Sequence, residues 1–194
     1  MYQADLLEDP KRMNHKHVFE QEFLPLMEAL YNYAVHLTRN KVEAEDLVQE
    51  TYKKAFGSMD KYQQGTNAKA WLFRILYNAF INELRYGGRR PRMVDLEEAI
   101  TKGNAVPASG ASSLSETPFQ SSLGDEITWA VNSLDRQQRA VVIMAYLEDF
   151  KYEEIAAILQ VPVGTVRSRL HRAKKVLEKK LLSYAISRGY RPNH

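Results

Sequence analysis

The apolar positions between Tyr152 and Leu181 predict two helices joined by a short turn. Within each helix these positions recur at the spacing of a single buried face. The turn falls at Gln160-Val161-Pro162, because proline lacks an N–H group, restricts the residue before it and is tolerated where a new helix begins. The buried residues are Ile155, Ala156, Ile158 and Leu159 in the first helix, then Val166, Leu170, Ala173, Leu177 and Leu181 in the second.

The opposite face of the second helix is polar and basic, with Arg167, Ser168, Arg169, His171, Arg172, Lys174 and Lys175. A helix, a tight turn and a second helix of this kind are typical of a helix-turn-helix, whose recognition helix enters the major groove. Charge alone would also fit an ordinary solvated helix surface. Gly164 and Thr165 at the helix start favour DNA binding, because free N–H groups there approach phosphates while nearby arginines and serines reach base edges.

The first half of the chain predicts three helices after a polar N-terminal tail, residues 1–16. We expect a helix from about Val18 to Thr38, one from Lys41 to about Phe56 behind an Asn40–Glu43 capping box, and one from Lys69 to Tyr86. Residues 57–68 between the last two have the composition of a turn or a small pocket. Inward positions are Phe23, Met27, Leu30, Ala34 and Leu37 in the first helix, and Ala44, Leu47, Val48, Thr51 and Ala55 in the second.

Two polar faces in this half allow more than one interpretation. Asp46, Gln49 and Glu50 share one face of the second helix, which by default is a solvated acidic face. The third helix is apolar around most of its circumference and leaves only a narrow polar stripe of Arg74, Asn78, Asn82 and Arg85. This stripe fits contacts to bases and phosphates and fits equally well the wet edge of a mostly buried helix.

Residues 89–124 are rich in Ser, Gly, Ala and Pro, which predicts a flexible linker. Helical patterns resume at Asp125 and again after Asp135, an expected N-cap, and complete a four-helix C-terminal domain. The sequence therefore predicts an all-α fold of two small helical domains. The expected units are a tail (1–16), a first domain (17–88), a linker (89–124), a helix-turn-helix domain (125–187) and a C-terminal tail (188–194).

The composition of the chain excludes several classes of function. Charged residues make up 26% of the chain, the formal net charge is +3 and there is no cysteine, which excludes disulfides and thiolate chemistry. No apolar run approaches membrane-spanning length, and we expect a cytoplasmic protein. No pattern combines a nucleophile, a base and an orienting group, or has metal-ligand spacing, so we expect neither an enzyme nor a cofactor. A free-standing helix-turn-helix regulator is the main rival, although no dimerisation heptad is visible.

Three stretches together carry a family resemblance: NKVEAEDLVQETYKKAF (40–56), GTNAKAWLFRILYNAFINELR (65–85) and YEEIAAILQVPVGTVRSRLHRAKKVLEKKL (152–181). In this order, with a linker before the last, they resemble the extracytoplasmic-function (ECF) group of bacterial RNA polymerase sigma factors. The resemblance covers roughly residues 20–185. It departs at Lys151, where the family usually has a Ser or Thr before the helix-turn-helix, so we expect a weaker cap there.

The resemblance assigns roles to individual residues. Docking on the clamp helices of the polymerase's largest subunit falls to Asp46, Leu47, Gln49 and Glu50. Recognition and melting of the promoter −10 element, with capture of a flipped base, fall to Tyr62, Gln63, Gln64, Gly65, Thr66, Asn67, Ala68, Arg74, Asn78, Asn82 and Arg85. Recognition of the −35 element falls to Gly164, Thr165, Arg167, Ser168, His171, Arg172 and Lys175.

The resemblance also implies partners. These are core RNA polymerase, through its clamp helices and its flap region, promoter DNA, and an anti-sigma factor that holds the protein off DNA until a signal or stress arrives. We expect a monomer when the protein is free. The acidic residues Asp95, Glu97 and Glu98 in the linker would lie toward the RNA exit path.

Overall fold

The structure is a computed structural model that describes residues 10–87 and 124–190. Its N-terminal half begins with helices α1 (Pro10–Val18) and α2 (Met27–Thr38). Between them lie a π-helical turn over Phe19–Phe23 and a 3-10 turn over Leu24–Leu26. The prediction of a tail followed by one helix from Val18 is therefore wrong at both points. Helix begins at Pro10, and the ladder changes pitch around Pro25, which has no N–H group to continue it.

Helices α3 (Lys41–Gly57) and α4 (Ala68–Gly87) follow the predicted bounds closely. The side-chain oxygen of Asn40 accepts hydrogen bonds from the N–H groups of Val42 at 2.9 Å and Glu43 at 3.3 Å, which confirms the predicted N-cap. The reciprocal half of the predicted capping box differs, because the Asn40 N–H donates to Oγ1 of Thr38 and Glu43 accepts from Nδ2 of Asn40. A short 3-10 turn over Met59–Lys61 lies in the loop between them. Gly65 in that loop has φ of 78°, a left-handed conformation that favours glycine.

Aromatic rings fill the space between the helices of this half. Tyr33 stacks on Phe73 with ring centroids 4.9 Å apart, and Phe23 stacks on Trp71 at 5.2 Å. Trp71 is half-buried against this core, as expected for a packing role. Met27 was expected in the buried stripe but is 47% exposed, because the change of pitch before α2 turns it toward solvent.

The C-terminal half consists of α5 (Asp125–Asn132), α6 (Arg136–Tyr146), α7 (Tyr152–Leu159) and α8 (Val163–Ser187). Asp135 caps α6 as predicted, by accepting the N–H of Gln138 at 2.8 Å. Helix α7 ends at Gln160, which adopts the left-handed conformation with φ of 55°, and α8 starts after Pro162. Val166, Leu170 and Ala173 are buried, which confirms the first part of the predicted stripe, whereas Leu177 and Leu181 are half-buried.

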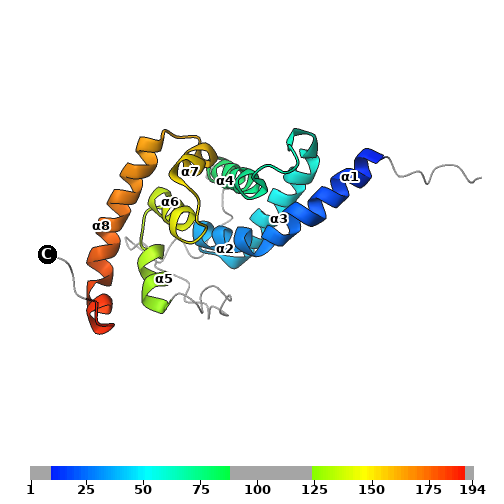
Figure 1. Cartoon of the computed structure of the whole chain (residues 1–194). Helices are drawn as coiled ribbons and strands as arrows, with labels where there is room; N and C mark the ends of the chain where they lie inside the picture. Colours follow the sequence, from blue (N-terminus) through cyan, green and yellow to red (C-terminus); the bar gives the residue numbers. More distant parts are fainter. Residues whose placement is uncertain (1–9, 88–123, 191–194) are drawn as a thin grey trace, which may run out of the picture.

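The two halves pack directly against each other. Helix α7 lies against α4, and α6 lies against the C-terminal end of α2, while α8 runs along the outer side of the C-terminal half (Figure 1). The predicted linker, with Asp95, Glu97 and Glu98, lies almost wholly outside the described residues. Within residues 10–87 and 124–190, no helix is long and apolar enough to cross a membrane.

Candidate DNA and polymerase interfaces

The acidic face predicted on α3 is exposed in the folded chain. Asp46 and Gln49 are exposed, and Glu50 is half-buried in an ion pair with Lys54 one turn later, at 3.3 Å between Nζ and Oε1. Leu47 is only 3% exposed, so this side chain holds α3 to the core and does not reach the surface. Of the four residues assigned to docking, three are therefore available to a partner.

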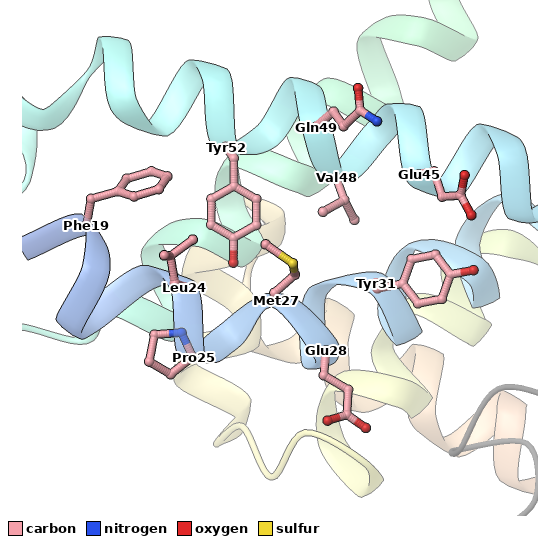
Figure 2. A pocket seen from close by; sticks show the side chains of 10 residues that line it. All are labelled: Phe19, Leu24, Pro25, Met27, Glu28, Tyr31, Glu45, Val48, Gln49 and Tyr52. Atoms are coloured by element: carbon pink, nitrogen blue, oxygen red, sulfur yellow. The ribbon is translucent and has the colours of Figure 1, made fainter. Parts of the chain in front are cut away.

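An apolar groove continues this face toward the start of α2 (Figure 2). Leu24 and Met27 form one wall with large exposed side chains, and Glu45 and Gln49 of α3 border the other. The hydrophobic pattern placed Met27 in the core and so missed this groove. Pro25, next to it, was the available signal, because a proline shifts the face that the following helix presents.

The loop assigned to base capture divides into a packed part and an exposed part. Tyr62 packs its ring between Phe23, at 4.9 Å, and Trp71, at 5.1 Å. Its hydroxyl donates to the Glu22 carboxylate, and burial followed by this bond raises the pKa of Tyr62 to about 12. The phenol therefore stays neutral. Gln63, Gln64, Gly65, Thr66 and Asn67 are exposed, and Ala68 is half-buried.

Asn67 nevertheless forms hydrogen bonds with both ends of its side-chain amide. Its Oδ1 accepts the N–H of Ala70 at 2.9 Å and so caps α4, while its Nδ2 donates to Oε1 of Glu154 in α7 at 2.7 Å. A side chain assigned to DNA is thus held by the other half of the chain.

The polar stripe of α4 faces solvent, with Arg74, Asn82 and Arg85 exposed and Asn78 half-buried. A small hollow brings Asn78 and Asn82 together with Lys54, Ser58 and Lys61 from the end of α3 and the turn after it. Sequence spacing did not indicate the two lysines, because they come from a different helix and turn. The hollow combines amide groups suited to base edges with positive charges suited to phosphate.

The recognition helix α8 presents its assigned residues to solvent. Gly164, Arg167, Ser168, His171, Arg172 and Lys175 are exposed, and Thr165 is half-buried. Ser168 donates its hydroxyl to the carbonyl of Thr165 at 3.0 Å, and Nε of Arg172 donates to the carbonyl of Ser168 at 3.3 Å. The Arg172 side chain therefore lies along the helix, with its terminal nitrogens free of protein hydrogen bonds among the described residues.

A second groove lies between α6 and the C-terminal part of α8. Tyr146, Leu182 and Tyr190 line it with exposed fractions of 59%, 47% and 71%. Lys174, Lys175 and Lys179 also border it, so the groove pairs apolar and basic surface. No group of three or more His, Asp or Glu side chains able to hold a metal ion occurs among the residues that the structure describes.

Two different sequence families match the two halves of the chain. The sigma-70 region 2 family matches residues 23–90, and the sigma-70 region 4 family matches residues 125–177. An ECF RNA polymerase sigma factor, EcfG from Rhodopseudomonas palustris, is 34% identical over 158 residues, which cover 80% of this chain and 81% of that protein. The chain belongs to the ECF sigma factors.

Two further relatives agree. The ECF sigma factor SigE of Mycolicibacterium smegmatis is 38% identical over 156 residues, or 80% of this chain; the match spans 58% of that longer relative. The solved structure of the sigma factor RpoE from Bartonella quintana, in complex with the anti-sigma factor NepR, has a TM-score of 0.64 and 34% identity over 84% of this chain and 96% of that one.

Sigma factors bind core RNA polymerase and promoter DNA. In this ECF sigma factor, region 2 corresponds to the N-terminal half with the α3 face and the α4 stripe, and region 4 corresponds to the half with the helix-turn-helix. The acidic face of α3, which the sequence pattern alone left as ordinary solvated surface, therefore lies within the sigma-70 region 2 match.

Proposed function

We propose that this chain is a promoter-specificity subunit and not an enzyme. The observation that carries the proposal is that one chain exposes three separate faces: the α3 face, the α4 stripe and the outer face of α8. Asp46, Gln49 and Glu50 dock on the polymerase clamp, Asn78 and Asn82 contact the −10 element, and Arg167 and His171 contact the −35 element. Binding two DNA elements through one tether raises the effective concentration of the second contact.

The two grooves extend the polymerase contacts. The groove beside Met27 continues the α3 face, so a clamp helix that docks on Gln49 can also bury apolar side chains there. The groove beside Tyr146 and Leu182 takes the flap region, because it offers apolar surface on the part of α8 beyond the DNA-binding residues.

We also propose control by an anti-sigma factor in the cytoplasm. The support is the relative RpoE, whose structure was solved bound to the anti-sigma factor NepR and which shares 34% identity with this chain. Release from such a partner in response to stress or another signal would make the two DNA-binding faces available.

Transcription in vitro tests the proposal. Sigma-free core polymerase is incubated with a genomic DNA library, with and without the protein, and transcript starts are mapped. We expect a small set of new starts that share a −35 and a −10 element. Arg167→Ala should abolish most of them without changing competition for core polymerase. Binding of duplex DNA without any added initiation would instead indicate a free-standing helix-turn-helix regulator.

A further inference from the structure

The contact between the two domains is built from specific polar pairs. Nζ of Lys69, at the start of α4, lies 2.8 Å from Oε2 of Glu148 and 2.9 Å from the Glu148 carbonyl, in the turn after α6. The Glu148 side chain is 8% exposed. Lys69 also lies 5.2 Å from the ring centroid of Phe150, which packs edge-on against Phe73 at 5.0 Å. Because the Glu148 carboxylate is nearly buried while Lys69 is about one-third exposed, removing Lys69 would leave a buried charge without its partner, which is costly.

In the second contact, an arginine of each domain donates a hydrogen bond to a backbone carbonyl of the other domain. Nη2 of Arg139, in α6, donates to the carbonyl of Leu37 in α2 at 3.3 Å, and Nη2 of Arg39 donates to the carbonyl of Leu134 at 3.2 Å. Each domain thus donates to a carbonyl of the other, one in the last turn of α2 and one in the turn between α5 and α6. Arg136 lies 5.6 Å from the centroid of the Phe80 ring in α4 and adds a cation–π contact.

The third contact holds Asn67, a side chain assigned to the −10 element. Glu154 accepts the N–H of Lys151 with one carboxylate oxygen and Nδ2 of Asn67 with the other, at 2.8 and 2.7 Å. The same carboxylate therefore caps α7 and holds the −10 loop. By contrast, Asp46 and Gln49 stay exposed, so the docked arrangement leaves the α3 face free.

This arrangement brings the two DNA-binding faces close together. The start of α8 lies no more than roughly 30 Å from Asn67. From Glu154 the chain rises about 8 Å to the end of α7 at Leu159 and spans at most about 14 Å from there to Val163, and the Asn67–Glu154 side-chain contact adds less than about 10 Å. Promoter elements centred about 25 base pairs apart are separated by roughly 80 Å of duplex at 3.4 Å per base pair. The docked chain cannot reach both elements at once.

We propose that the C-terminal domain docks on the N-terminal domain of the same chain as an autoinhibitory contact, and that the chain must open between α4 and α7 before it can engage both promoter elements. Region 4 of the same chain thus covers the surface formed by the ends of α2 and α4. The claim that docking prevents simultaneous binding of both promoter elements rests on the proposed sigma function, whereas the docking itself does not. If the open form is a minor state of about 10%, opening raises apparent affinity for a two-element promoter about tenfold.

Energy transfer between dyes tests the docking. The chain has no cysteine, so dyes attach only at Gln21→Cys and Ser183→Cys, both at exposed positions in opposite domains. Lys69→Glu places two carboxylates together in the docked form and leaves both in water in the open form. We expect high transfer in the parent, low transfer with Lys69→Glu, and restored transfer with the charge swap Lys69→Glu, Glu148→Lys. Equal transfer in all three would overturn the proposal.

A reversible cross-link tests the consequence. Lys69→Cys and Glu148→Cys are joined by a short disulfide-containing bifunctional reagent, and initiation is measured on a promoter found in the library experiment. The cross-linked protein should lose initiation at least tenfold, still compete for core polymerase, and recover when dithiothreitol cuts the link. Full initiation while cross-linked would overturn autoinhibition. No initiation after reduction, together with high energy transfer in the parent, would count against the sigma function and leave the docking supported.

Discussion

Arg139 in α6 is 2% exposed, and its Nη2 donates a hydrogen bond to the carbonyl of Leu37 at the end of α2, 3.3 Å away. Its Nη1 donates to the carbonyls of Asn132 at 3.1 Å and Leu134 at 3.3 Å. Burial first, and then the charges of Arg39 and Arg136, lower the pKa of this guanidinium to about 10, so it remains charged at neutral pH. One buried cation therefore joins α2, α5 and α6.

Replacing this cation tests how much it stabilises the fold. Arg139→Met keeps the aliphatic bulk but removes the donor to the carbonyls of Leu37 and Asn132, while the Leu134 carbonyl keeps its hydrogen bond from Arg39. We expect the free energy of unfolding in urea, followed by circular dichroism, to fall by about 1–3 kcal/mol. Gln137→Met, exposed on the same helix, is the control and should change it by less than about 0.5 kcal/mol. Equal effects of the two changes would show that the buried hydrogen bonds contribute little.

Acid should weaken the docking through His36. This residue of α2 is 3% exposed, and burial lowers its pKa from the usual 6.5. A hydrogen bond with Asn132 raises the pKa in part, and the charge of Arg139 lowers it further. Below about pH 6.5 the open form takes up a proton that the docked form resists, so docking is lost progressively as pH falls toward the lowered pKa. Glu148 has the opposite effect on docking. Burial raises its pKa, so as the pH falls the docked form takes up this proton at a higher pH than the open form does, which favours docking.

Energy transfer against pH separates the two groups. Between about pH 7.5 and 5.5, transfer should fall in the parent and stay flatter in His36→Gln. Glu148→Gln removes the opposing titration and should make the fall steeper. If His36→Gln follows the parent curve, His36 does not report the docking.

Base recognition and phosphate contact can be distinguished on α8. Arg172→Ala should cost about 1–3 kcal/mol at one −35 base pair and relax specificity there. Lys175→Ala should weaken binding about equally on all sequences and lower the salt dependence by roughly one charge. Both are measured by fluorescence anisotropy on a set of single-substituted −35 duplexes. A uniform loss with Arg172→Ala would make that residue a phosphate contact.

The docking face of α3 is tested by the double change Asp46→Ala, Glu50→Ala. It should reduce competition for sigma-free core polymerase at least tenfold, since two charges leave the contact. The fold should be spared, because among residues 10–87 and 124–190 the ion pair that is lost is the partly exposed Glu50–Lys54 pair, worth about 0.3–0.5 kcal/mol. Glu153→Ala, exposed on α7, serves as the control. Unchanged competition by the double variant would remove the docking role from this face.

The start of α7 offers a stabilising change. Lys151 occupies the N-cap position without a side-chain acceptor, and only Glu154 reaches back to its N–H, at 2.8 Å. Lys151→Ser supplies an oxygen for the N–H groups of the first turn and should raise the free energy of unfolding by about 1 kcal/mol. Lys151→Ala should not. Equal urea midpoints for the two would show that Glu154 alone already satisfies this helix end.

Signals that act over a few residues were predictable from the sequence. The caps at Asn40 and Asp135 and the turn at Pro162 depend on side chains beside the backbone groups they satisfy, so spacing was enough. Met27 was misplaced because a change of helical pitch at Pro25 rotates every later position, which a constant period cannot anticipate. The residues assigned to promoter DNA stay predictions, since exposure alone does not establish a contact.

The contact between the domains could not be predicted, because Asn67 and Glu154 are far apart in the sequence and each has a sufficient local role as a capping residue. One hint was present. Helix α4 is apolar around most of its circumference, which the N-terminal domain alone does not require. Phe73 and Phe80 explain it, since the first meets Phe150 and the second meets Arg136 of the other domain.

Helix α8 is unbroken from Val163 to Ser187, so its 25 residues form a rod about 37 Å long at 1.5 Å per residue. The residues assigned to the −35 element occupy its first half, up to Lys175, and the groove beside Leu182 begins there and extends to its far end. If both proposed contacts form, the length of this helix would fix the distance between the −35 element and the flap region of the polymerase. Evolution can alter which bases its first turns contact without moving the far end, but a single inserted residue would turn the two ends out of phase by about a quarter of a revolution.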